Sequence, residues 1–388
     1  MAKFKQRGKT WSYHIYIGTD PITKKRIETS KGGFKTKKEA QAAARLVELE
    51  KQNGTLIKES DVPFQDIAQK WIKDYSRSGV KVSSVRARDK EMKHFINVWG
   101  LYPISKITSE MYQDRMYELN EKYSYNYLSG IHACGRMIFR FAVKRGLIKI
   151  NPTEDFQMPK QQKTVEELEK TEEEYVFLEK EELAQFLKLT QSEGLPMDRL
   201  VFTVLAYTGL RIGELLSLKW TDFNESVGTL RVTKTLYNPT NHIEKYQLLS
   251  PKTPGSVRTI RIDDMIINIL KSQRIRQNET KLKNRMIYKD SGFIFAREDG
   301  HPQLRKVVET RLKRLLKISN IHKNITPHSF RHTHTSLLIE AGVGIKEIQQ
   351  RLGHSDINTT MNIYAHMTAN MEEKASQQFS KLMKDLLL

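Results

Sequence analysis

The residues of this chain that are best suited to chemistry form a basic, polar set near its C-terminal end. His328 and Arg331 stand three positions apart in His-Ser-Phe-Arg, directly after Pro327. The apolar periodicity that follows predicts a helix, which would carry both residues on one face near its N-terminus, where anions bind well. Arg211 opens a second expected helix after a Gly turn in Thr-Gly-Leu-Arg. Because unpaired buried Arg and His side chains are costly, we expect this set to face a phosphate.

A second stretch extends the set. Gly353 follows the apolar-periodic segment 345–352 and predicts a helix end, which leaves His354 in a turn with its ring free to point into a cleft. Tyr364 comes ten positions later. A lone His near a helix start is usually a cap, and a lone Tyr usually packs in a core. The joint pattern of such residues favours a catalytic site.

A metal site is the alternative interpretation of the histidines. His328, His332 and His334 lie close together in sequence, but no Cys or carboxylate accompanies them at ligand spacing. We therefore expect no metal and no cofactor.

At these residues the chain resembles the tyrosine recombinase (phage integrase) family. The resemblance implies that Tyr364 is the nucleophile and that the other catalytic residues are Arg211, Lys252, His328, Arg331 and His354. It also implies that Glu214 braces the first arginine of the set, Arg211. All these positions are filled by the expected residue type in the expected order.

The resemblance also implies a mechanism. Guanidinium groups suit the charge that builds on the non-bridging oxygens of an attacked phosphodiester. Tyr364, with an ordinary pKa of about 10, must lose its proton, and His328 is the expected acceptor. Lys252 is the expected acid for the leaving 5′-oxygen, and His354 a further donor. The product would be a 3′-phosphotyrosine, formed without metal or ATP.

Composition agrees with a nucleic-acid partner. The 388 residues include 65 Lys and Arg against 45 Asp and Glu, a net charge of +20, which makes a polyanion the expected partner. The length suggests two or three domains. The single Cys134 excludes an intramolecular disulfide, and no apolar run is long enough for a signal or a membrane span. We expect a cytoplasmic protein without a membrane partner.

The expected fold is multidomain and mainly helical (α+β). Residues 1–55 alternate like strands and then turn helical, which predicts a small three-stranded sheet plus one helix. This module resembles the arm-type DNA-binding domain of many integrases. Its expected DNA contacts are Trp11, Tyr13, Lys24, Lys25 and Arg26.

Residues 62–157 show helical periodicities that predict a compact bundle, including helices capped by Ser83 and Thr108. The bundle resembles the core-binding (SAM-like) domain of the family. Its expected phosphate contacts are Lys81, Arg86, Arg88, Lys90, Arg136 and Arg140, each of which could instead belong to a solvated face. Residues 158–182 are rich in Glu and are expected to form an acidic linker. Residues 183–388 would form the catalytic domain, mostly helical with a small antiparallel sheet and a C-terminal tail helix.

We expect a site-specific recombinase that integrates and excises a phage genome or another mobile element at attachment sites in double-stranded DNA. The resemblance implies a homotetramer whose subunits exchange their apolar C-terminal tails, with excisionase and DNA-bending host proteins as candidate further partners. The alternatives are a type IB topoisomerase-like enzyme, which shares the chemistry, and a DNA-binding regulator with an inactive catalytic domain.

Overall fold

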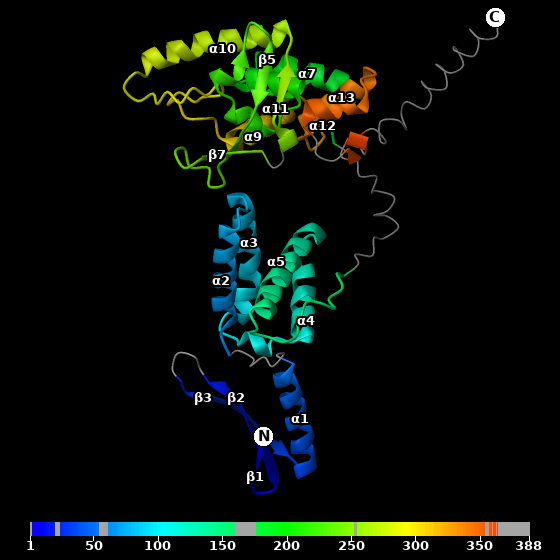
Figure 1. Cartoon of the computed structure of the whole chain (residues 1–388). Coiled ribbons are helices and arrows are strands. Elements are labelled where there is room, and N and C mark those ends of the chain that lie inside the picture. The colour runs from blue at the N-terminus through cyan, green and yellow to red at the C-terminus, as the bar shows by residue number, and fades with distance from the viewer. Residues whose placement is uncertain are drawn as a thin grey trace, which may run out of the picture. The chain divides into compact units, whose positions relative to one another are not determined.

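The computed structural model describes residues 2–19, 24–53, 61–159, 176–251, 254–353, 357–358, 360–361 and 363. The chain divides into two compact units, Met1–Thr164 and Val165–Leu388. The first holds a small sheet with one helix and a helical bundle, and the second is mostly helical (Figure 1). Within the described residues, no helix is long and apolar enough to cross a membrane.

The first element of the chain is an antiparallel sheet in the order β1-β2-β3, covered by one helix. Its members are β1 (Lys3–Arg7), β2 (Thr10–Thr19), β3 (Arg26–Phe34) and α1 (Lys37–Gln52). The Thr36 side chain accepts a hydrogen bond from the backbone N–H of Glu39 at 3.2 Å and so starts the helix. Tyr13 and Ile15 of the sheet pack with Ala44 of the helix. The predicted three-stranded sheet plus helix is confirmed.

The helical bundle follows. It comprises α2 (Phe64–Arg77), α3 (Val82–Trp99), a 3-10 turn (Ile104–Lys106), α4 (Ser109–Asn120) and α5 (Tyr125–Lys144). Aromatic rings fill its core, with Phe95 stacked on Tyr112 at 5.6 Å between centroids. Thr108 caps α4 as predicted, by accepting from the Met111 N–H. The predicted cap at Ser83 is wrong, because α3 already begins at Val82 and Ser83 lies inside it.

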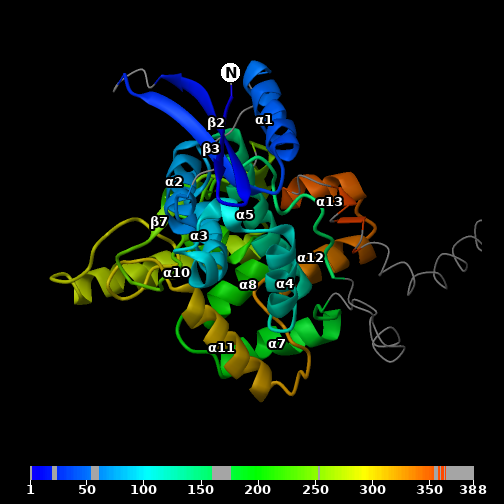
Figure 2. The same cartoon turned by 90° about the horizontal axis from the view of Figure 1, so that it is seen from below.

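The second unit has a helical core around a short antiparallel sheet of order β4-β5-β8. A separate two-stranded hairpin, β6-β7, lies between β5 and β8 in the chain. Figures 1 and 2 show α12 beside α13 in this unit. Its elements are α7 (Lys180–Ser192), α8 (Asp198–Thr208), α9 (Ile212–Ser217), a 3-10 turn (Trp220–Asp222), β4 (Phe223–Asn224), β5 (Thr229–Val232), β6 (Thr235–Tyr237), β7 (Gln247–Leu249), a 3-10 turn (Pro254–Ser256), β8 (Arg258–Arg261), α10 (Asp264–Lys283), α11 (Arg305–Ile318), α12 (Ser329–Glu340) and α13 (Ile345–Leu352).

The start of this unit differs from the expected boundary. Leu178 is buried, and its N–H donates to the Thr333 hydroxyl of α12 at 3.0 Å. Glu179 and Glu182 form a capping box that begins α7 at Lys180. The last residues of the segment predicted as an acidic linker are therefore part of the second folded unit, because their glutamates cap a helix. Residues 160–175 of that segment lie outside the described residues.

Candidate active site

Arg331 lies in the first turn of α12 and is almost completely buried, with 1% of its surface exposed. Next to it, the Phe330 ring stacks on Phe202 of α8 with 5.6 Å between centroids, which fixes the helix in the core. The Arg331 guanidinium donates from Nη1 to the Gly209 carbonyl at 2.9 Å and from Nη2 to the Leu352 carbonyl at 2.6 Å. One arginine thus joins the C-terminal ends of α8 and α13, which the chain separates widely.

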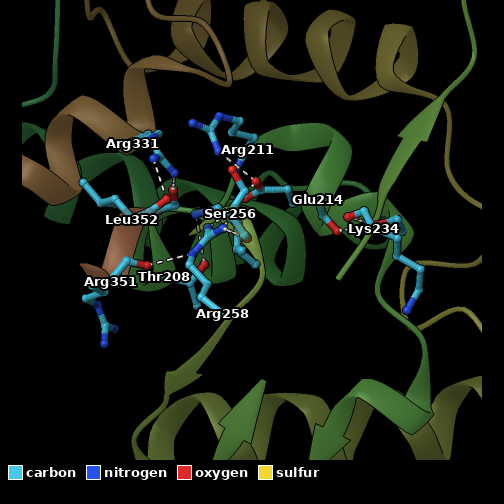
Figure 3. Close-up of polar contacts among 12 residues, drawn as sticks. Thr208, Arg211, Glu214, Lys234, Ser256, Arg258, Arg331, Arg351 and Leu352 are labelled. Carbon is cyan, nitrogen blue, oxygen red and sulfur yellow. Dashed lines mark hydrogen bonds and ion pairs between the residues drawn. The ribbon is translucent and has the colours of Figure 1, made fainter. Parts of the chain in front are cut away.

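Arg211 stands at the N-cap of α9, and 40% of its side chain is exposed. Its Nη1 donates to Oε1 of Glu214 at 2.8 Å, and its backbone N–H donates to Oε2 of the same carboxylate at 3.1 Å. Glu214 itself is buried. The predicted brace between Glu214 and Arg211 is therefore present in the geometry (Figure 3).

A third arginine completes this network. Arg258, the first residue of β8, is buried and donates from Nη2 to Oε2 of Glu214 at 2.8 Å. Its Nε donates to the Arg351 carbonyl at 2.8 Å, at the end of α13 (Figure 3). Arg258 was not among the predicted site residues. The sequence does carry a signal for it. Arg258 lies two positions before Ile260 in an alternating strand and therefore shares its inward face, where an unpaired charge is unfavourable.

The pKa values show how strongly positive this region is. Desolvation and the charge of Arg211 lower the pKa of Arg331 to about 9, although Glu214 raises it. Burial alone would raise the pKa of Glu214, but the hydrogen bond and charge of Arg258, followed by those of Arg211, hold it below its usual value. Arg331 therefore remains charged at neutral pH and Glu214 remains ionised, and with three arginines to one carboxylate the region has an excess of positive charge for an anion.

His328 stands at the N-cap of α12, three residues before Arg331. The residue is exposed, and its ring lies perpendicular to the His332 ring with 4.8 Å between centroids. Desolvation on its inner side, then the charges of His332, Arg331 and Arg211, lower its pKa to about 4. The imidazole is thus neutral at pH 7 and can accept a proton.

His334, further along α12, links the helix to α8 and to Arg351 of α13. Its Nδ1 is 2.9 Å from the Ala206 carbonyl, and its Nε2 accepts from Nε of Arg351 at 3.1 Å. Because Nε2 must be the acceptor, Nδ1 carries the proton and the ring is neutral. Desolvation and the charge of Arg351 lower its pKa to about 4. His334 is a structural histidine, and among the described residues no cluster of His, Cys, Asp or Glu is suited to a metal ion.

Three of the predicted catalytic residues, Lys252, His354 and Tyr364, lie outside the described residues. Their neighbours are described. α13 ends at Leu352, and Gly353 adopts a left-handed conformation with φ of 65°, as the sequence predicts. Ile363 is buried in a small cluster with Ile339, Ile348 and Leu352. The chain therefore returns to the α12–α13 pair immediately before the predicted nucleophile.

Some of the predicted DNA contacts are structural residues. Tyr13 is 4% exposed and stacks on Phe34, so it is a core residue of the N-terminal sheet and not a DNA contact. Arg88 is bound to Glu91 at 2.5 Å and to the Gly130 carbonyl at 2.8 Å, which makes it an internal brace of the bundle. Both assignments are corrected, because these side chains satisfy their packing or charge within the fold.

The other predicted contacts lie at the surface or close to it. Trp11 is partly buried beneath the ammonium of Lys37, 5.6 Å from the ring centroid. Lys81 and Arg86 are partly buried, and the exposed members are Lys24, Lys25, Arg26, Lys90, Arg136 and Arg140. Arg26 also stacks over the Tyr16 ring at 5.2 Å. These side chains remain candidates for contacts to phosphate.

Comparisons with known proteins identify the class. Residues 176–371 match the phage integrase family, and residues 2–51 match an arm DNA-binding domain. The chain is 30% identical to the integrase of Staphylococcus phage L54a over 82% of this chain and 93% of that protein. It is 32% identical to the prophage ps2 probable integrase of Lactococcus lactis, over 91% of this chain and 92% of the relative. A solved structure of the Tn1549 transposon integrase with circular intermediate DNA matches with a TM-score of 0.60 and 25% identity, over 80% of this chain and 99% of that one.

The chain belongs to the phage integrase family. It is a tyrosine recombinase, a site-specific DNA recombinase, and the resemblance noted in the sequence is confirmed. The comparisons do not favour a topoisomerase or an inactive DNA-binding regulator.

Proposed function

We propose that the enzyme breaks and rejoins DNA through a 3′-phosphotyrosine on Tyr364, and that it does so to integrate and excise a phage genome or another mobile element. The observation that carries this proposal is the pairing of a half-exposed, braced Arg211 with the buried Arg331 beside a neutral His328. Two permanently charged guanidinium groups and a proton acceptor are what a phosphodiester needs when a hydroxyl attacks it.

The proposed step balances as follows. The Tyr364 oxygen forms a bond to phosphorus, and the bond from phosphorus to the 5′-oxygen breaks. The phenolic proton passes to His328, and Lys252 gives a proton to the departing 5′-oxygen. Arg211 and Arg331 bind the non-bridging oxygens, with His354 as a further donor. The cationic side chains supply the charge neutralisation, so we propose no metal and no ATP.

His328 has a low pKa in the free protein, which by itself makes it a weak base. Two of the groups that lower its pKa are the positive charges of Arg331 and Arg211. A bound phosphate would neutralise part of that charge and raise the pKa of His328. The histidine would therefore become a better proton acceptor when DNA is in place, which couples activation to substrate binding.

The proposed domains are an arm-type DNA-binding domain over 1–55, a core-binding bundle over 62–157 and a catalytic domain that starts at α7. The proposed assembly is a homotetramer on attachment-site DNA with exchanged C-terminal tails, assisted by an excisionase and DNA-bending proteins. The basic composition supports the DNA partner, because a net charge of +20 favours release of counterions from phosphates.

A suicide duplex that is nicked near the cleavage point tests the proposal. The unchanged protein should form a covalent adduct that survives denaturing electrophoresis, whereas Tyr364→Phe should bind the duplex and form none. Tyr207→Phe is the matched control, because Tyr207 is an exposed tyrosine of the same unit, and this variant should form the adduct normally. An adduct formed by Tyr364→Phe would show that the nucleophile is another residue.

A further inference from the structure

Arg258 holds a central position in the arginine network, because it contacts Glu214, Arg351 and Ser256. Its guanidinium forks onto Glu214, with Nη2 at 2.8 Å from Oε2 and Nη1 at 3.4 Å from Oε1. Nε donates to the Arg351 carbonyl at 2.8 Å, and Nη1 also donates to the Ser256 carbonyl at 3.2 Å. These backbone contacts fix the plane of the guanidinium so that Nη1 and Nη2 face the Glu214 carboxylate.

The two arginines share the oxygens of Glu214 unequally. Oε2 accepts from the side chain of Arg258, and Oε1 accepts at 2.8 Å from Nη1 of Arg211. Arg211 therefore makes one side-chain bond to the carboxylate. A guanidinium beside an unoccupied carboxylate prefers two parallel bonds. Among the described residues, no acceptor is bound to Nη2 or Nε of Arg211.

We infer that Arg258 is a positioning residue for DNA cleavage: it occupies the second oxygen of Glu214, which prevents Arg211 from closing onto that carboxylate and keeps its outer donors available to the scissile phosphate. This inference rests on the proposed role of Arg211 as a phosphate clamp. Arg258 itself touches no substrate atom in this mechanism.

The charges around Glu214 support the same conclusion. Two guanidinium groups act on this carboxylate, from Arg211 at the start of α9 and Arg258 on β8, and the charge of Glu214 in turn acts on Arg331 of α12. Arg258 is the group that most lowers the pKa of Glu214, against the effect of burial. Without Arg258 the carboxylate would either draw in Arg211 or bind a proton as the pH falls. Either change alters the position of Arg211.

A double-mutant cycle separates this role from simple structural support. The four proteins are the unchanged chain, Arg258→Met, Glu214→Gln and the double variant, each compared by single-turnover cleavage of the nicked duplex and by DNA affinity. Arg258→Met should slow cleavage by about 10- to 100-fold, and the affinity should change by less than about threefold. In the Glu214→Gln background the same change should alter the cleavage rate by less than about threefold, because a neutral amide no longer competes for Arg211.

The pH profile gives a readout that structural support alone would not move. Loss of Arg258 should raise the pKa of Glu214. A protonated Glu214 no longer competes for Arg211, so the slow cleavage by Arg258→Met should recover in part at mildly acidic pH, where the unchanged protein shows no such rise. This additional acid limb, a rise in rate on acidification, should be absent from the double variant, which has no carboxylate at position 214. Arg261→Met is the matched control, since Arg261 lies on the same strand with an exposed side chain, and it should show neither the slow cleavage nor the acid limb.

Equal loss of cleavage on Arg258→Met in both backgrounds would overturn the inference. If Arg258→Met alone fails to fold, the comparison between the double variant and Glu214→Gln decides, and a double variant that is about tenfold slower overturns it. Arg211→Ala on the same duplex tests the proposed function separately: normal cleavage by that variant refutes the clamp, whereas impaired cleavage without coupling between positions 258 and 214 refutes only the present inference.

Discussion

Replacement of Gly209 by Ala should damage both the fold and the site. Gly209 ends α8 with φ of 62°, and its carbonyl accepts from Arg331. A Cβ at this position would lie 2.7 Å from Cδ2 of His334 and 2.7 Å from Cδ2 of Leu352. Neither neighbour can move easily, because the His334 ring is hydrogen bonded on both sides and Leu352 is completely buried.

The loss of folding stability in Gly209→Ala has two separate causes. An alanine in the left-handed conformation costs about 1–2 kcal/mol. The overlap with two fixed side chains adds about 1–3 kcal/mol, as is typical when a packed core receives an extra methyl group. Gly342 provides the matched control, because it also has a positive φ, 77°, but nothing lies within 4 Å of its added Cβ. Gly342→Ala should therefore show the first effect only.

Calorimetry on the full chain would measure the melting temperature of the catalytic unit. Since 1 kcal/mol corresponds to about 2–4 °C for a unit of this size, Gly209→Ala should melt lower than Gly342→Ala by about 2–12 °C. It should also cleave the nicked duplex more slowly, because the Gly209 carbonyl, which this change would displace, accepts a hydrogen bond from Arg331. Equal melting temperatures for the two variants would refute the packing argument.

Three further outcomes are expected. Arg211→Ala and Arg331→Ala should each slow cleavage by about 10²–10³-fold in a duplex assay that contains EDTA, and an absolute requirement for Mg²⁺ would count against the mechanism. The free energy of unfolding should fall by up to about 3 kcal/mol between about pH 6.5 and pH 4, because buried His334 has a pKa of about 4 and the same histidine in the unfolded chain binds a proton at higher pH. Urea titrations over this pH range should show a shallower fall for His334→Gln. Deletion of residues 1–55 should leave cleavage of core-site DNA but abolish recombination between full attachment sites and lower the salt dependence of binding, and equal recombination by both proteins would contradict a bridging role.

The local order of elements could be predicted because it depends on short-range patterns. The strand alternation around Ile15 and the cap at Thr108 are confirmed, and so is the helix end at Gly353. The ends of elements were harder to predict where charged residues also cap a helix. Glu179 and Glu182 were predicted to belong to the acidic linker, but they form the capping box that begins α7.

The hairpin β6-β7 was not predicted either. The sequence predicted only a small antiparallel sheet in this part of the chain. Strands β5 and β8 do pair, with Leu230 opposite Ile260, but β6 and β7 lie between them in the chain and pair with each other. A period-2 pattern only three residues long is too short to be recognised in isolation.

The sequence by itself determined the chemistry of this protein, because the types and spacing of Arg211, His328 and Arg331 are local facts that the chain carries into any fold. Only the tertiary structure decided what each charge does. Arg258 and Arg88 resemble other basic residues in sequence, yet one binds Glu214 and the other binds the Gly130 carbonyl of another helix. The physical reason is that a buried charge must find its partner across the fold, and the partner of Arg258 is 44 residues away in the chain.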